Sequence, residues 1–343
     1  MEVSDRTESR DLRWLLALTA AVGTFLLAFV PGGAWLSGGT AADVLMSATL
    51  KQLLTVLLLF VVPSLWARLV WRTSPWVAAA LSALAFGFAW FSCKGAADAL
   101  YLAPLSILPG VGLYALQRLK LSNFRTVLYA SFLTLAGMFV CVCLRDLLES
   151  GDAYVSCRAL IDAYAQVLEQ GGAMELSVAG VSLKELVGAY RMNPETVCMP
   201  FMLGAAMCAG LSNTLFSHLW NKRGGAELRP LPAFQQWRCE RWYVVLAATL
   251  TISMMLLGMF GLAAAGALSS VAEVMWRMPC ALGGLCAVRR ASLKLKKGWI
   301  FWCACAALVV LPSIASMILM LLGMLSSLRK PQANENGEGN GER

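Results

Sequence analysis

Long apolar blocks constrain this chain more than any other feature. Hydrophobic residues make up 59% of its 343 positions and charged residues only 14%. Crossing about 30 Å of hydrocarbon takes roughly 20 apolar residues in a helix. The sequence therefore predicts an all-α, polytopic transmembrane helix bundle of about eight or nine spans, with a short helical extracytoplasmic insertion. The blocks are 14–30, 53–70, 76–93, 102–116, 126–144, 197–219, 242–265, 271–288 and 299–325.

Two blocks depart from a plain span. Block 14–30 is preceded by at least as many acids as bases and is followed by further spans, so we expect an uncleaved anchor rather than a signal peptide. Block 102–116 is short and contains Pro104, Pro109 and Gly110, which is typical of a broken or re-entrant helix. Whether this block crosses also decides the side of the C-terminus.

The distribution of Lys and Arg orients the bundle, because basic loops stay in the cytoplasm. Alternate connections between the blocks are basic, whereas segment 145–195 carries four bases against eight acids and should lie outside. We therefore expect a cytoplasmic N-terminus and a location in the bacterial cytoplasmic (inner) membrane. The bases of the four cytoplasmic loops are Arg68 and Arg72; Arg118, Lys120 and Arg125; Lys222, Arg223, Arg229, Arg238 and Arg241; and Arg289, Arg290, Lys294, Lys296 and Lys297.

The extracytoplasmic insertion, 145–195, carries helical signals. A first helix should end at Gly171 and Gly172, and a second should begin at Ser182, with Glu185 completing a capping box. These helices are either a connector or a lid over a cavity. Residues 1–330 should form a single membrane domain, and the polar tail 331–343 should be disordered. The residues expected on one face of the first helix are Cys157, Leu160, Ile161, Tyr164, Val167 and Leu168.

Charged residues near the spans mark the candidate site. Glu273 and Arg277 are four residues apart within an apolar block, and Lys94 and Asp98 have the same spacing. Such pairs join on one helix face, and hydrocarbon tolerates charges only when they are paired or face a cavity. We therefore predict a polar site toward the outer side, with Asn213 as a further candidate. The alternatives are helix ends stabilised by snorkelling side chains and an interhelical contact at Asn213.

Motifs for catalysis, cofactors and metals are absent from the sequence, so we expect no enzyme and no cofactor. The single histidine, His218, should be an interfacial residue. The eleven cysteines show no C-x-x-C spacing and are expected to be small apolar residues of the core. A disulfide between Cys157 and Cys198 is the less favoured alternative.

The net charge of +8 follows from the basic cytoplasmic loops, which meet anionic membrane lipid. Segment 289–297 has no aromatic platform beside its bases, so we expect no nucleic-acid partner.

Small residues recur at helix-packing spacing. Ala17 and Ala21 in block 14–30 are the candidate contact with a membrane protein partner. The other pairs are Ala79 and Ala83, Ala205 and Ala209, Ala206 and Gly210, and Gly261 and Ala265.

The stretch Leu-Pro-Ala-Phe-Gln-Gln-Trp-Arg at 231–238 resembles the proline, phenylalanine and tryptophan-arginine signature of the YybS-like family of predicted bacterial membrane proteins. The family has no established activity and is distantly similar to substrate-binding components of energy-coupling-factor transporters. Ala17 and Ala21 resemble the small residues through which some such components contact their coupling subunit. Cys239 stands where the family usually continues to a proline. Further matching stretches are Leu108-Pro109-Gly110, the glycine-containing run 281–288, and Leu322-Gly323 without the acid that usually follows.

These features predict a protein that binds, or helps to transport, a small-molecule ligand. The alternative is a non-transporting scaffold that holds cell-envelope or division machinery through its basic loops.

Overall fold

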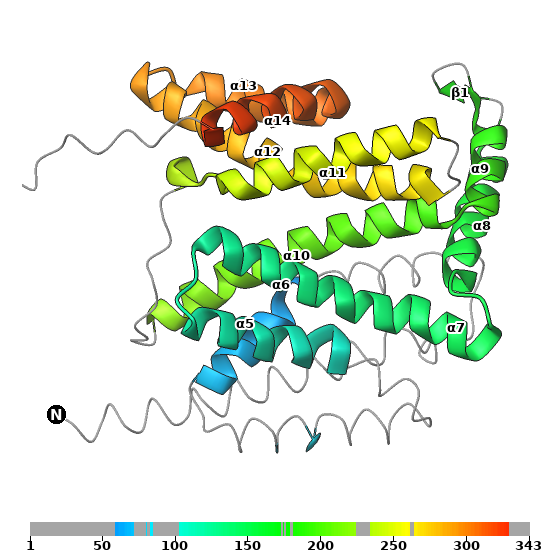
Figure 1. The fold of residues 1–343 in the computed structure, drawn as a ribbon, viewed down its shortest axis with the longest axis horizontal. Helices are drawn as coiled ribbons and strands as arrows, with labels where there is room; N and C mark the ends of the chain where they lie inside the picture. The colour runs from blue at the N-terminus through cyan, green and yellow to red at the C-terminus, as the bar shows by residue number, and fades with distance from the viewer. Residues whose placement is uncertain are drawn as a thin grey trace, which may run out of the picture. The chain divides into compact units, whose positions relative to one another are not determined.

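The computed structural model describes residues 59–71, 80, 83–84, 103–172, 174, 176–178, 181–223, 234–260 and 264–328. These residues are almost entirely helical (Figure 1). The chain divides into two compact units, Met1–Leu231 and Pro232–Arg343, which we call unit 1 and unit 2. The single membrane domain predicted over 1–330 stays a prediction.

Unit 1 contains two long apolar helical stretches that run antiparallel. The first half of the first stretch packs along the second half of the other, since Ser131 of α6 contacts Gly210 of α10. The described elements of this part are the helix Leu59–Trp71, η1 Ala103–Ile107, α5 Leu108–Arg118, α6 Asn123–Phe139, η2 Val140–Leu144, α7 Arg145–Ser150 and α10 Glu195–Arg223.

Small side chains allow α6 and α10 to approach closely. A Cβ atom built on Gly210 would lie 2.6 Å from the Ser131 backbone nitrogen, so this glycine has no room for a side chain. Ala206 and Ala209 of α10 are fully buried. The predicted packing role of these α10 residues is confirmed, because small residues let helix backbones meet.

Block 102–116 forms a continuous helix rather than a broken one. The chain runs through the π-helical turn η1 directly into α5, and Pro109 lies at the junction where the helix changes type. η1 and α5 have 5 and 11 residues, which corresponds to about 24 Å of helix. The predicted break is therefore wrong, and the re-entrant alternative stays a prediction.

The insertion between α7 and α10 is built as predicted at its helix ends. α8 ends before Gly171 and Gly172, and Gly172 has a φ of 65°. At α9 the Ser182 hydroxyl accepts from the Glu185 N–H at 3.2 Å, and the Glu185 carboxylate accepts from the Ser182 N–H at 3.1 Å. In Figure 1, α8 and α9 run crosswise to α6 and α10 at one end of unit 1. The elements are α8 Val155–Gln170, β1 Ser177–Val178, β2 Val181–Ser182 and α9 Leu183–Met192.

The predicted apolar face of α8 is only partly buried. Cys157 and Ile161 are buried, and Leu168 packs against the same cluster, to which Val187 of α9 contributes. This cluster covers one side of α8 only, so the neighbouring apolar side chains of the helix stay exposed at the surface. The exposed residues are Leu160, Tyr164 and Val167, at 40%, 61% and 50%.

Unit 2 is built around α12. α11 and α14 both pack against it, and α13 contacts both α12 and α14. The predicted single span 299–325 is wrong, because the helix breaks at Leu311, whose φ is −131° and ψ is 64°. The residue before a proline avoids the α-helical region, and Pro312 follows directly. The elements are η4 Phe234–Gln236, α11 Arg241–Met259, α12 Ala264–Lys294, α13 Trp299–Val310 and α14 Pro312–Leu328.

Three helices in the described part of the chain are long and apolar enough to cross a membrane, and they point to a membrane location. They confirm blocks 126–144, 197–219 and 271–288 as long apolar helices. Blocks 53–70 and 242–265 correspond to shorter apolar helices. Block 14–30, most of block 76–93 and the tail 331–343 lie outside the described residues. The three long helices are Asn123–Ser150, Glu195–Trp220 and Ser270–Lys294.

Candidate functional site

Glu273 and Arg277 form the predicted ion pair on α12. The Arg277 Nη1 donates to Glu273 Oε1 at 2.8 Å, one turn earlier on the same helix. The Arg277 Nε also donates to Ser316 Oγ of α14 at 3.0 Å. The guanidinium therefore joins the carboxylate to a second helix. The side chains are 58% exposed for Glu273 and 32% for Arg277, so the carboxylate remains accessible.

The pair lies within a candidate span, Ser270–Lys294. Glu273 is three residues from the start of that span at Ser270, which corresponds to about 5 Å along the helix axis. Charged groups within hydrocarbon are costly unless they are paired or face a polar cavity. The polar site and the helix end stabilised by snorkelling side chains therefore both stay predictions.

Pro279 interrupts the hydrogen bonds of α12 next to this pair. Proline has no N–H, so the carbonyl of Met275, four residues earlier, loses its helical donor. The Tyr243 hydroxyl of α11 donates to that Met275 oxygen. The Cys239 thiol donates to the Pro279 carbonyl at 3.1 Å. Neither Tyr243 nor Cys239 was predicted as a partner; Pro279 inside an apolar block was the available signal.

α12 and α14 touch through glycine. A Cβ atom built on Gly284 would overlap the Leu319 carbonyl, and one built on Gly323 would overlap the Cys280 carbonyl. Only glycine permits this backbone approach. The contact fixes the helix that carries Ser316 beside the helix that carries Arg277.

Asn213 of α10 lies in an interhelical contact and is 2% exposed. Its Nδ2 donates to the Leu59 carbonyl at 3.0 Å, and its Oδ1 accepts from the Ser64 N–H at 3.2 Å. Pro63 explains the first bond, because the Leu59 carbonyl is the one that this proline leaves without a helical donor. Asn213 thus forms an interhelical contact, which the sequence analysis gave as the alternative to a place in the polar site. Lys94, Asp98, Ala17 and Ala21 lie outside the described residues.

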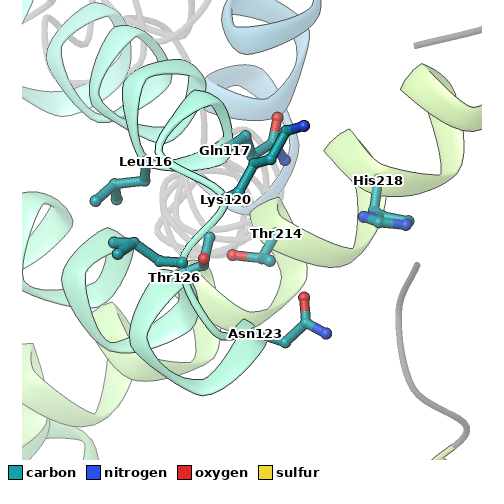
Figure 2. A pocket seen from close by; sticks show the side chains of 8 residues that line it. Leu116, Gln117, Lys120, Asn123, Thr126, Thr214 and His218 are labelled. Carbon is teal, nitrogen blue, oxygen red and sulfur yellow. The ribbon is translucent and has the colours of Figure 1, made fainter. Parts of the chain in front are cut away.

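A small polar hollow lies where α5, α6 and α10 meet in unit 1 (Figure 2). Its volume of about 20 Å³ admits about one water-sized group. In Figure 2 the hydroxyls of Thr126 and Thr214 face each other. Gln117 is fixed beside the hollow, since its Nε2 donates to Ser217 Oγ at 3.0 Å and its Oε1 accepts from that hydroxyl at 3.2 Å. The lining residues are Leu116, Gln117, Lys120, Leu121, Asn123, Thr126, Thr214 and His218.

His218 was predicted to be an interfacial residue, and the structure places it in the wall of this hollow with 8% exposure. The other polar lining residues were not predicted as a site. They come from three helices and from the turn between α5 and α6, and none forms a motif with its neighbours in sequence.

The cysteines are free thiols wherever the structure describes them. Cys143, Cys157 and Cys198 gather in one buried cluster. The Cys198 thiol donates to Met202 Sδ at 3.5 Å, and the Cys157 thiol donates to the Pro194 carbonyl at 3.7 Å. Burial raises the pKa of the Cys157 thiol, which lies in the insertion. Within the described ranges, no group of three His, Cys, Asp or Glu side chains is placed to hold a metal ion.

Comparison of the chain with protein-family models, curated proteins and solved structures finds no match. The resemblance to YybS-like proteins therefore stays a prediction.

Proposed function

We propose that this chain is a multi-pass protein of the bacterial inner membrane that binds, or helps to transport, a small polar solute. The observation that carries the proposal is the Glu273–Arg277 ion pair within the candidate span Ser270–Lys294. Ionisable side chains at such positions line solute or ion pathways far more often than they face lipid. The accessible carboxylate suits a solute that brings a cationic or hydroxyl group.

The site has a donor and an acceptor at fixed positions. Ser316 and Glu273 both engage the Arg277 guanidinium, which holds this long side chain in one orientation. A solute can therefore meet the carboxylate without first paying the rotational entropy of ordering the arginine.

The arrangement of unit 1 supports the proposed orientation. The C-terminal ends of α5 and α10 meet at Gln117 and Ser217, and the basic residues near both ends are the ones assigned to the cytoplasm. Cys143 and Cys198 meet at the opposite end of α10, next to the insertion. This supports a cytoplasmic N-terminus with 145–195 outside, since antiparallel spans alternate in direction.

Charge-removing variants test the solute site. Removing one member of a partly buried pair leaves an uncompensated charge, whereas removing both relieves it. We expect Glu273→Gln and Arg277→Met each to lower the melting temperature in detergent, or the retention of a co-purifying small molecule detected by mass spectrometry. The double variant should lose less than the two single losses combined.

A matched pair in the insertion provides the control. Arg191 of α9 and Asp162 of α8 form an ion pair at 2.6 Å, with side chains 47% and 49% exposed, and both residues lie outside the candidate spans. Arg191→Met and Asp162→Asn should change neither property, because ion pairs that water reaches contribute little. Single changes at Glu273 and Arg277 that are equally silent would reject the site.

A scaffold is the second candidate function. Lys294, Lys296 and Lys297 form an exposed basic turn after α12, and no acid occurs in sequence from 274 to 334. Co-purification of envelope or division proteins that is lost when these three lysines become glutamines, with no retained small molecule, would favour this candidate.

A further inference from the structure

The first helix of the apolar segment 299–328 is too short to cross a membrane. α13 has 12 residues, which corresponds to about 18 Å of helix against about 30 Å of hydrocarbon. The chain leaves the helical conformation at Leu311, and α14 then lies beside α13 (Figure 1). The segment contains no Asp, Glu, Lys or Arg, so its composition suits hydrocarbon along its whole length.

α14 runs in the same direction as α12. The Arg277 Nε donates to Ser316 Oγ at 3.0 Å, and a Cβ atom built on Gly283 would lie 3.8 Å from the Gly323 Cα atom. The two contacts occur in the same order along both helices. An antiparallel α14 would place Arg277 and Ser316 on opposite sides of the glycine contact, about 20 Å apart along the axis. The observed hydrogen bond excludes that direction.

Two parallel helices that follow each other need a connection that runs back, and α13 is that connection. Only residues 295–298 separate α12 from α13, so α13 begins near the level at which α12 ends. The bend at Leu311 then lies about 18 Å from that level. Its N–H donates to the Ala307 carbonyl at 2.8 Å, and its carbonyl accepts from the Ala315 N–H at 2.9 Å. Both backbone groups of Leu311 are therefore paired, as hydrocarbon requires.

The bases at the two ends of the segment independently indicate one side of the membrane. Basic residues next to spans stay in the cytoplasm, and no acid occurs in sequence from 274 to 334 to offset these bases. A single crossing by 299–328 would leave one basic end outside, whereas a hairpin keeps both inside. The bases are Lys294, Lys296 and Lys297 before the segment, and Arg329 and Lys330 after it.

The surface of α13 fits lipid as its covering. None of its residues is buried. Trp302, near the start of the helix, is 69% exposed, and Val309 and Val310, near the bend, are 83% and 74% exposed. Tryptophan suits the headgroup layer and aliphatic side chains suit the acyl chains below it. The order along α13 is therefore the order met on entering a bilayer.

We propose that segment 299–328 is a re-entrant helical hairpin. It enters the hydrocarbon from the side on which α12 ends, turns at Leu311 and returns to the same side. Lipid acyl chains cover α13, and the C-terminus lies on the same side as the basic turn 295–298, which the Lys and Arg distribution assigns to the cytoplasm. The hairpin does not depend on a solute bound at Glu273.

Epitope tags in the full-length chain test the return. One tag is inserted between Lys296 and Lys297 and another follows Arg343, in separate variants. Antibody binding is compared in intact and permeabilised spheroplasts. We expect both tags to bind only after permeabilisation. A third tag, inserted between Met259 and Ala264, is the control: it should bind in intact spheroplasts, because α12 crosses the membrane between it and the turn 295–298.

Photocrosslinking in nanodiscs tests the depth of the hairpin. A diazirine amino acid in place of Val310 should form adducts with lipid acyl chains, identified by mass spectrometry. The same amino acid in place of Lys296, in the exposed turn, should react with water and give no acyl-chain adduct.

Tags at 296 and 343 on the same side, together with acyl-chain adducts at 310, support the hairpin. Tags on opposite sides overturn it, because the segment would then cross the membrane. Absence of acyl-chain adducts at 310 also overturns it, since the two helices would then lie outside the hydrocarbon.

Discussion

Pro63 in unit 1 and Pro279 in unit 2 interrupt apolar helices in the same way but are compensated differently. At Pro63 the single side chain of Asn213 donates to the freed Leu59 carbonyl and also accepts from the Ser64 N–H. At Pro279 the Tyr243 hydroxyl only donates, to the freed Met275 carbonyl.

Both arrangements satisfy a backbone group that hydrocarbon cannot hydrate. In both places a proline in an apolar block is accompanied by a polar partner on a neighbouring helix. It does not predict which residue that partner is. Asn213 satisfies two backbone groups and Tyr243 only one, so the two sites should differ in how much stability they lose on substitution.

Asn213→Leu should have the largest effect. It leaves the Leu59 carbonyl and the Ser64 N–H without their side-chain partner inside a buried contact, at a cost of roughly 2 to 4 kcal/mol of unfolding free energy. Unfolding in detergent, followed by tryptophan fluorescence, measures this cost. Ser212→Ala is the control, since the Ser212 hydroxyl contacts the neighbouring Phe60 carbonyl at 3.2 Å and also the Ala209 carbonyl of its own helix at 3.0 Å, so its loss leaves no buried N–H without an acceptor. An Asn213→Leu variant as stable as the native protein would contradict the structural role.

Tyr243→Phe should cost less, roughly 1 to 2 kcal/mol, because one acceptor loses one donor and the ring still packs. The same unfolding measurement applies. A loss equal to or greater than that of Asn213→Leu would show that the number of satisfied backbone groups does not set the ranking.

Pro279→Ala tests whether the Tyr243 hydroxyl compensates for the hydrogen bond that Pro279 removes from α12. The introduced amide can donate to the Met275 carbonyl, so Tyr243→Phe should cost less in this background than in the native chain, with a coupling of about 1 kcal/mol. A double-mutant cycle measures that coupling. Additive losses would mean that the Tyr243 hydroxyl stabilises the unit by something other than compensating the proline.

Ser182→Ala should have the smallest effect of the series, about 0.5 to 1 kcal/mol. The capping box at α9 lies on an exposed part of the insertion, where water can replace the lost bond. Hydrogen exchange should speed up at the start of α9 and remain unchanged in α6 and α10. Faster exchange throughout unit 1 would show that the insertion and the spans unfold together.

The sequence determined the features that depend on neighbouring residues. Apolar length predicted the long helices α10 and α12, and the Ser182 and Glu185 spacing predicted the start of α9. The Glu273–Arg277 ion pair also followed from sequence, since residues four apart always share a helix face. Pro312 could have predicted the break at Leu311, but the continuous hydropathy of 299–325 concealed it.

The tertiary structure alone decided which distant residues meet. Nothing in the sequence joins Asn213 to Pro63, Tyr243 to Pro279, or Gln117 to Ser217. Such contacts depend on the direction and rotation of whole helices, which apolar composition leaves open because lipid and protein are equally good surroundings for an apolar side chain. Two features restrict those choices. Carbonyls freed by proline need a polar partner on another helix, and glycines allow a second backbone to approach closely. Both features stabilise the fold only once the helices are packed.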